Sequence, residues 1–149
     1  YSALIMAAAS KGKFHIDPIE ILEETASLAE RNIQRSGFGS NIRVLRGDAF
    51  EILQCLTTPY DMIFLDASKG QYPEYLPECL RLIREGGVIL SDNVLYRGLV
   101  AQKGHVDHKH RTIAVRLGEY LDSLCKNPLL DTAIIPIGDG LAVSYRRGD

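Results

Sequence analysis

The spacing of apolar positions along the chain changes repeatedly between that of strands and that of helices. Residues 60–65 and 87–90 are apolar at nearly every position, which is typical of parallel strands buried on both faces. Between such runs, apolar residues recur three or four positions apart and predict helices. In chain order, the predicted elements are a helix at 3–9, a strand at 14–16, a helix at 17–36, a strand at 41–45, a helix at 49–56, a strand at 60–65, a helix at 72–83, a strand at 87–90, a helix at 112–126, and two strands at 132–137 and 141–145.

Turn-forming residues set several of these boundaries. Asp17 followed by Pro18 is a typical helix start, with an N-cap residue before proline at the first helical position. Gly37 is expected to end that helix. The sequence Gly138-Asp139-Gly140 predicts a hairpin between the last two strands.

Strands that alternate with helices predict an α/β fold with a doubly wound, mostly parallel sheet, which here ends in an antiparallel hairpin. No repeat or low-complexity linker interrupts the sequence, so residues 1–149 are expected to form a single domain. Ligands of such sheets bind at the carboxyl ends of the strands. Polar residues at strand ends are therefore the candidates for function.

Composition narrows the class of protein. The chain is 46% apolar and 24% charged, which is ordinary for a globular domain and excludes a disordered or collagen-like chain. With a net charge of −2, the protein as a whole does not attract nucleic acid electrostatically. Binding of nucleic acid would therefore need a local cationic patch. No apolar run approaches the roughly 20 residues that span a membrane, and no signal peptide is recognisable. A cytoplasmic protein without membrane contact is expected.

The three cysteines, Cys55, Cys79 and Cys125, are far apart and form no paired motif. This pattern argues against a disulfide framework or a zinc site and predicts reduced thiols. Cys79 is expected to be a core residue.

Three oxygen-bearing side chains follow two consecutive predicted strands. Asp66 directly follows the apolar run at 60–65. Asp92 and Asn93 follow the run at 87–90, after Ser91. Two carboxylates and an amide oxygen suit Mg²⁺ or a similar divalent cation. The alternative is that each residue only caps the turn or helix that follows.

Two further residues near strand ends have a functional and a structural interpretation. Lys69, three residues after Asp66, has reason to lose its proton beside a dication and would then act as a base; otherwise it is a solvated surface lysine. Asp48 follows another predicted strand and either accepts a hydrogen bond from a bound adenine or caps the helix that begins at Ala49.

The segment 97–116 is the only clearly cationic stretch of the chain. Its candidates for binding phosphates are Arg97, Lys103, Lys109 and Arg111. The alternative is an ordinary solvated loop and helix face. The histidines at 105, 108 and 110 do not have the i, i+4 spacing of a helical metal pair, so no zinc site is expected there.

Residues 60–72 (YDMIFLDASKGQY) and 86–98 (GGVILSDNVLYRG) resemble the motifs of the cation-dependent O-methyltransferases, which use S-adenosylmethionine (SAM) and include catechol and caffeoyl-CoA enzymes. The resemblance covers essentially the whole chain and implies a Rossmann-like class I methyltransferase fold. It also implies site residues: Asp66, Asp92 and Asn93 as ligands of Mg²⁺, Lys69 as the base, and Ser2, Asp48, Ala49 and Asp66 as residues against the cofactor.

Within this family, residues 92–101 and 131–144 are similar to the bacterial enzymes that methylate 5-hydroxyuridine at the wobble position of tRNA. The cationic segment would then hold the tRNA anticodon region. A small catechol-like phenol or an acyl-CoA phenol is the alternative substrate. The resemblance also implies a homodimer.

The chain departs from the family pattern at three places. The glycine-rich motif expected before Tyr1 is absent from the sequence. The family places an acid, usually Glu, at the end of the first strand to hold the cofactor ribose, whereas here His15 falls at that position when the chain is aligned from Asp17. Pro136 occupies the place of a glutamate that catechol enzymes carry.

Overall fold

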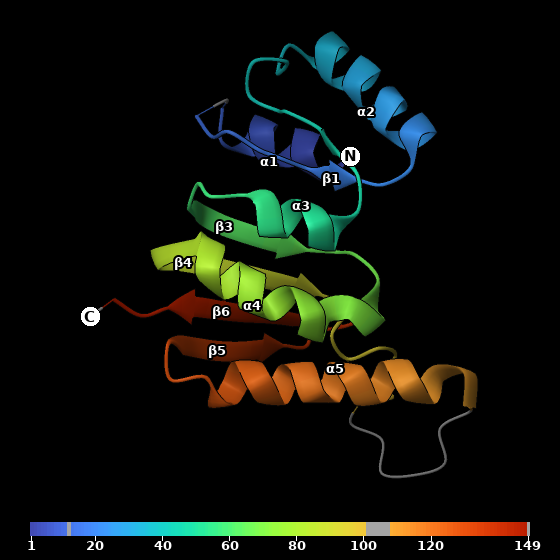
Figure 1. The fold of residues 1–149 in the computed structure, drawn as a ribbon, viewed down its shortest axis with the longest axis vertical. Coiled ribbons are helices and arrows are strands. Elements are labelled where there is room, and N and C mark those ends of the chain that lie inside the picture. The colour runs from blue at the N-terminus through green and yellow to red at the C-terminus, as the bar shows by residue number, and fades with distance from the viewer. Residues whose placement is uncertain (12, 101–107, 149) are drawn as a thin grey trace. The chain divides into compact units, whose positions relative to one another are not determined.

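The computed structural model describes residues 1–11, 13–100 and 108–148 (Figure 1). The chain divides into two compact units, Tyr1–Cys55 and Leu56–Asp149, and each is described by itself. Among the described residues, no helix combines the length and apolar character needed to cross a membrane.

The first unit contains a short parallel strand pair and three helices: α1 (Ser2–Ala9), β1 (Ile19–Glu20), α2 (Glu23–Ser36), β2 (Leu45–Arg46) and α3 (Ala49–Cys55). Ile19 of β1 pairs with Leu45 of β2. Its core is formed by Ala7, Ile33 and Ile42. Gly37 ends α2 in the left-handed conformation, with φ of +82°, as the sequence predicts.

The predicted start of the long helix is wrong. α2 begins at Glu23 rather than at residue 17, and the preceding residues are extended along the β2 segment. The carbonyl of Pro18 accepts a hydrogen bond from Leu45 N at 2.9 Å, and Asp17 forms an ion pair with Arg43 at 2.9 Å instead of capping a helix. The strand predicted at 14–16 is therefore shifted, and only Ile16 of that range forms a β-bridge, with Ile42.

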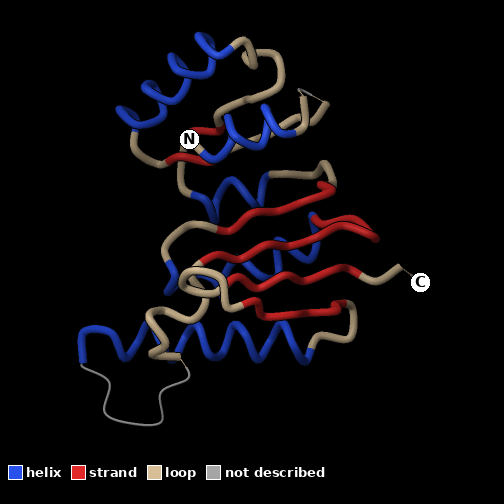
Figure 2. Tube along the Cα trace, turned by 180° about the vertical axis from the view of Figure 1, so that it is seen from behind, coloured by secondary structure: helices blue, strands red, loops and turns tan. Residues whose placement is uncertain are grey.

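The second unit is a four-stranded sheet with two long helices. Its elements are β3 (Tyr60–Leu65), a 3-10 turn (Lys69–Gln71), α4 (Tyr72–Leu82), β4 (Ile83–Asp92), α5 (His108–Lys126), β5 (Leu130–Ile135) and β6 (Leu141–Arg146). The strand order is β3-β4-β6-β5. β3 and β4 are parallel, whereas β6 is antiparallel to both β4 and β5. The α/β fold with a C-terminal antiparallel hairpin is confirmed (Figure 2).

Most predicted boundaries in this unit are right to within two residues. β4 is longer than predicted because it begins directly where α4 ends, and α5 begins four residues before the predicted position 112. Cys79 lies in the core as expected, where burial raises the pKa of its thiol to about 12, so it is no nucleophile at neutral pH.

Polar contacts inside the second unit link the sheet to α4 and α5. The fully buried hydroxyls of Ser91 in β4 and Tyr120 in α5 are 2.6 Å apart. The Tyr120 ring also packs edge-on against Tyr72 of α4, with ring centroids 5.3 Å apart. α5 is therefore held to the sheet by a specific hydrogen bond as well as by apolar packing.

We predict that Tyr120→Phe lowers the free energy of unfolding by about 1–2 kcal/mol, because it leaves the Ser91 hydroxyl buried without this partner. Tyr145→Phe is the control, since Tyr145 is 45% exposed. Urea denaturation checks both variants. Equal stability of the two variants would contradict the structural role of the Ser91–Tyr120 contact.

Candidate functional site

The carboxyl ends of β3 and β4 bring together the acids that the sequence singled out. Leu65 pairs in register with Ser91, so Asp66 and Asp92 occupy neighbouring positions at the same edge of the sheet. Asn93 follows with φ of +55°, a left-handed conformation that asparagine tolerates better than most residues. Such strained positions are concentrated at functional sites.

Each of the two carboxylates has one oxygen engaged within the chain. Asp66 Oδ1 lies 2.9 Å from Lys69 Nζ, and Asp92 Oδ1 accepts a hydrogen bond from Asn93 N at 2.7 Å. Within the described part of the chain, the second oxygen of each carboxylate accepts no hydrogen bond. The Asp66 side chain is also 49% exposed, so it is accessible to a ligand.

Tyr72, the first residue of α4, lies beneath these acids and is fully buried. Its hydroxyl contacts the carbonyl oxygen of Leu65 at 2.9 Å and that of Asp92 at 3.2 Å. It also accepts a hydrogen bond from Lys69 Nζ at 3.0 Å. Burial raises the pKa of the Tyr72 phenol, and the contact with Lys69 offsets only part of this rise, so the hydroxyl keeps its proton at neutral pH.

Lys69 is held in the site rather than free in solvent, since its side chain is 17% exposed. Burial alone lowers the pKa of its ammonium, but hydrogen bonds to Asp66 and Tyr72 outweigh this effect and the net pKa is raised. Lys69 therefore carries a proton in this arrangement. To act as the expected base, Lys69 would have to lose this proton. That loss requires a second positive charge close to Asp66.

The loop after β4 is fastened to the turn between β5 and β6 (Figure 2). Val94 N donates to the carbonyl of Gly140 at 3.0 Å, and Leu95 N donates to that of Asp139 at 2.9 Å. Tyr96 OH lies 2.8 Å from His110 Nδ1 at the start of α5. The position of Asn93 is thus set by the hairpin and α5 as well as by β4.

The donor chemistry of this edge fits a divalent cation. Carboxylate and amide oxygens are the hard ligands that Mg²⁺ and Mn²⁺ prefer. Among the described residues, no three His, Cys, Asp or Glu side chains gather as a metal cluster, so a three-ligand set here needs the amide of Asn93 beside the two carboxylates.

The remaining cofactor candidates lie in the first unit. Ser2 is the exposed first residue of α1 and Ala49 the first residue of α3. Asp48 Oδ1 accepts hydrogen bonds from Phe50 N at 2.8 Å and Glu51 N at 3.3 Å. Asp48 therefore caps α3 through Oδ1, which confirms the structural alternative.

Sequence reasoning missed Glu20, the acid at the end of β1. Glu20 pairs in register with Arg46, two residues before Asp48, so the two acids follow neighbouring parallel strands. Its Oε1 accepts a hydrogen bond from Leu22 N at 2.8 Å. The placement of His15 at this strand end is wrong, because β1 spans Ile19–Glu20 and its last residue is Glu20. The acidic pair Glu23-Glu24 at the first turn of α2 was the available signal for a later helix start.

The cationic candidates are only partly described. Arg97 and Arg111 are exposed, and within the described residues neither forms an ion pair. Lys103 and the side chain of Lys109 lie outside the described part. Arg116, in contrast, is paired with Glu74 at 2.6 Å.

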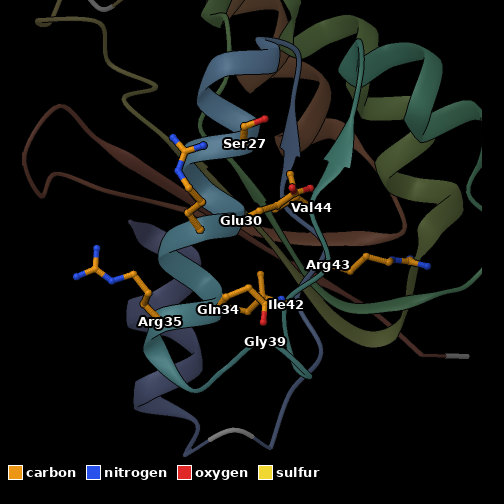
Figure 3. Close-up of a pocket in the computed structure, with 9 residues that line it drawn as sticks. Ser27, Glu30, Gln34, Arg35, Gly39, Ile42, Arg43 and Val44 are labelled. Atoms are coloured by element: carbon orange, nitrogen blue, oxygen red, sulfur yellow. The ribbon is translucent and has the colours of Figure 1, made fainter.

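A separate hollow lies in the first unit between α2 and residues 39–44 (Figure 3). Its lining residues include Glu30, Gln34 and Arg35 of α2 and, from the facing segment, Ile42 and Val44. None of the strand-end acids lines it, so this hollow is distinct from the candidate site.

Comparison with known proteins identifies the class. A family model described as O-methyltransferase matches residues 1–147. The chain belongs to the O-methyltransferase family.

Individual relatives agree with this assignment. The chain is 36% identical over 111 residues to a catechol O-methyltransferase of Niastella koreensis, covering 72% of this chain and 50% of the relative. It is 31% identical over 151 residues to the tapetum-specific methyltransferase 1 of Arabidopsis thaliana, covering 98% of this chain and 65% of the relative. The chain thus spans about half to two thirds of the length of these relatives.

A solved structure shows the same fold with a ligand. The O-methyltransferase TomG from Streptomyces achromogenes, solved in complex with SAM, superposes with a TM-score of 0.86 at 27% identity, covering 99% of this chain and 69% of that chain. The class I methyltransferase fold expected from the sequence is confirmed.

We predict that Gly140→Ala disrupts the loop that carries Asn93. Gly140 has φ of +84°, and an added Cβ would clash with Leu95 Cγ. Gly138→Ala is the matched control, because Gly138 also has a positive φ, of +58°, but has no atom within 4 Å of such a Cβ. Both variants are expected to lose about 1–2 kcal/mol from the left-handed backbone.

Only Gly140→Ala is expected to lose more than that, together with order in residues 93–97, as measured by thermal unfolding and amide hydrogen exchange. Equal losses of stability in the two variants would contradict the conclusion that the loop after β4 is held by the turn between β5 and β6.

Proposed function

We propose that this chain catalyses the transfer of a methyl group from SAM to a hydroxyl on an aromatic or pyrimidine ring, with a divalent cation held by Asp66, Asp92 and Asn93. The observation that carries the proposal is the arrangement at the ends of β3 and β4. Two carboxylates lie there on neighbouring strands, each with one oxygen that accepts no hydrogen bond within the described part. The family membership supports the methyl-transfer chemistry.

The first unit supplies residues suited to the cofactor. Glu20 at the end of β1 is the acid that we assign to the ribose hydroxyls, in place of His15. Asp48 and Ala49 at the start of α3 are assigned to the adenine, and Ser2 to the methionine carboxylate. SAM supplies an electrophilic methyl group, and these residues would bind its ribose, adenine and methionine parts.

Lys69 is assigned the proton transfer. Its Nζ already contacts Asp66, so it lies at the same strand end as the proposed cation ligands. A divalent cation supplies positive charge that acidifies the acceptor hydroxyl. Beside such a cation, Lys69 would be the residue of this chain that takes the proton from the acceptor hydroxyl.

For the acceptor, we propose 5-hydroxyuridine at the wobble position of tRNA. A 5-hydroxyuracil carries a hydroxyl next to a ring carbonyl, so it offers two adjacent oxygens as a catechol does. Exposed, unpaired Arg97 and Arg111 in the described part support a phosphate-bearing substrate. A small catechol-like phenol is the second candidate, which the name of the Niastella koreensis relative favours.

The cation assignment is tested by labelled-methyl transfer from SAM, with Mg²⁺, to tRNA that contains 5-hydroxyuridine and, in parallel, to catechol. Asp66→Asn and Asp92→Asn are each expected to lower kcat/KM by about 100-fold or more, because the carboxylate charge is removed. Asp61→Asn is the control, since Asp61 lies near the start of β3, away from the strand end, and pairs with Arg84. Full activity of the Asp66 and Asp92 variants, or full wild-type activity in excess chelator, would contradict the assignment.

The substrate assignment is tested by the double variant Arg97→Ala with Arg111→Ala. We predict a rise of about tenfold in KM for tRNA, because two phosphate contacts are removed, with unchanged turnover of catechol. The charge-matched control is Arg84→Ala with Lys126→Ala, two exposed cations at other positions of the second unit. An equal effect of the two double variants on tRNA would contradict the assignment, and label in catechol alone would favour the second candidate.

A further inference from the structure

The side chain of Tyr72 contacts both strand ends of the site. Its hydroxyl contacts the carbonyl oxygen of Leu65, the residue before Asp66, at 2.9 Å. The same hydroxyl contacts the carbonyl oxygen of Asp92 itself at 3.2 Å. The phenol thus spans the gap between β3 and β4 at the point where the two acids leave the sheet.

The hydrogen-bonding capacity of a phenol fixes the orientation of this hydroxyl. A backbone carbonyl only accepts hydrogen bonds, so the single proton of Tyr72 must point toward Leu65 and Asp92. The lone pairs of the oxygen are then left for Lys69, whose Nζ donates to it at 3.0 Å. Tyr72 therefore cannot donate to Lys69 while it holds the two carbonyls.

Packing holds the phenol in this place. Tyr72 is 0% exposed and its ring lies edge-on to Tyr120. Rigid support of this kind is what keeps the groups around a bound ligand within a fraction of an ångström of a productive geometry.

We propose that Tyr72 is a positioning residue for cation binding: its hydroxyl ties the ends of β3 and β4 together and so sets the separation of Asp66 and Asp92, while it also orients Lys69. This inference rests on the cation site of the proposed function. It assigns a role to a residue that touches neither the methyl donor nor the acceptor. The hydroxyl accepts a hydrogen bond from Lys69 Nζ and so helps to hold this amine beside Asp66.

The test is Mn²⁺ binding by isothermal titration calorimetry to the full chain as wild type, Tyr72→Phe and Tyr75→Phe. Tyr75 is the matched control, because it is a 3% exposed tyrosine of the same helix whose hydroxyl donates to Gln71 Oε1 at 3.0 Å. Tyr72→Phe is expected to weaken Mn²⁺ binding by about tenfold or more, the usual effect of losing a group that supports metal ligands. Tyr75→Phe is expected to bind Mn²⁺ like the wild type.

Amide hydrogen exchange gives a second readout that needs neither cation nor activity. The amides of residues 66–67 and 93–94 are expected to exchange about tenfold faster in Tyr72→Phe than in Tyr75→Phe. Tyr72→Phe removes the hydroxyl that contacts the Leu65 and Asp92 carbonyls. A third readout separates positioning from general loss of stability: Tyr72→Phe should lower kcat with little change in KM for SAM.

The outcomes distinguish this inference from the function on which it rests. Wild-type protein that binds no Mn²⁺ would overturn both. Wild-type binding with equal affinity in Tyr72→Phe would overturn the role of Tyr72 alone. Unchanged exchange at the strand ends would also overturn it, even if the variant were less stable.

Discussion

Leu65 lies alongside Ser91 where β3 and β4 pair in parallel, and this register brings Asp66 and Asp92 to one edge of the sheet. A shift of one residue would move every side chain of one strand to the opposite face. The register is held by buried packing on α4 and by the hydroxyl of Tyr72, which contacts the backbone of both strands. The chemistry proposed for this chain depends on that pairing.

Much of the second unit could be predicted from the sequence because its local signals agree with its tertiary contacts. The apolar run at 60–65 forms β3, although only Leu65 of this strand is buried, and the glycines at 138 and 140 have the positive φ angles that a tight turn needs. The acids at 66 and 92 could be placed because parallel strands end at the same edge. What the sequence could not supply is Tyr72, since nothing in its spacing distinguishes a core tyrosine from one that holds two strand ends.

The first unit shows where local signals mislead. Asp17-Pro18 has the chemistry of a helix start, yet pairing with residues 42–46 extends this segment, and Arg43 takes Asp17 as its ion-pair partner. Tertiary contacts outweighed the local preference. The error hid Glu20, which ends β1 beside the strand that leads to Asp48 and now replaces His15 as the acid assigned to the cofactor ribose.

The most direct test of the central claim, a divalent cation at the ends of β3 and β4, is the anomalous scattering of Mn²⁺ in crystals of the protein. The account predicts one strong peak within coordination distance, about 2.0–2.6 Å, of side-chain oxygens from Asp66, Asp92 and Asn93. Crystals equilibrated in millimolar Mn²⁺ that show no peak there, or show the ion on other residues, would contradict it.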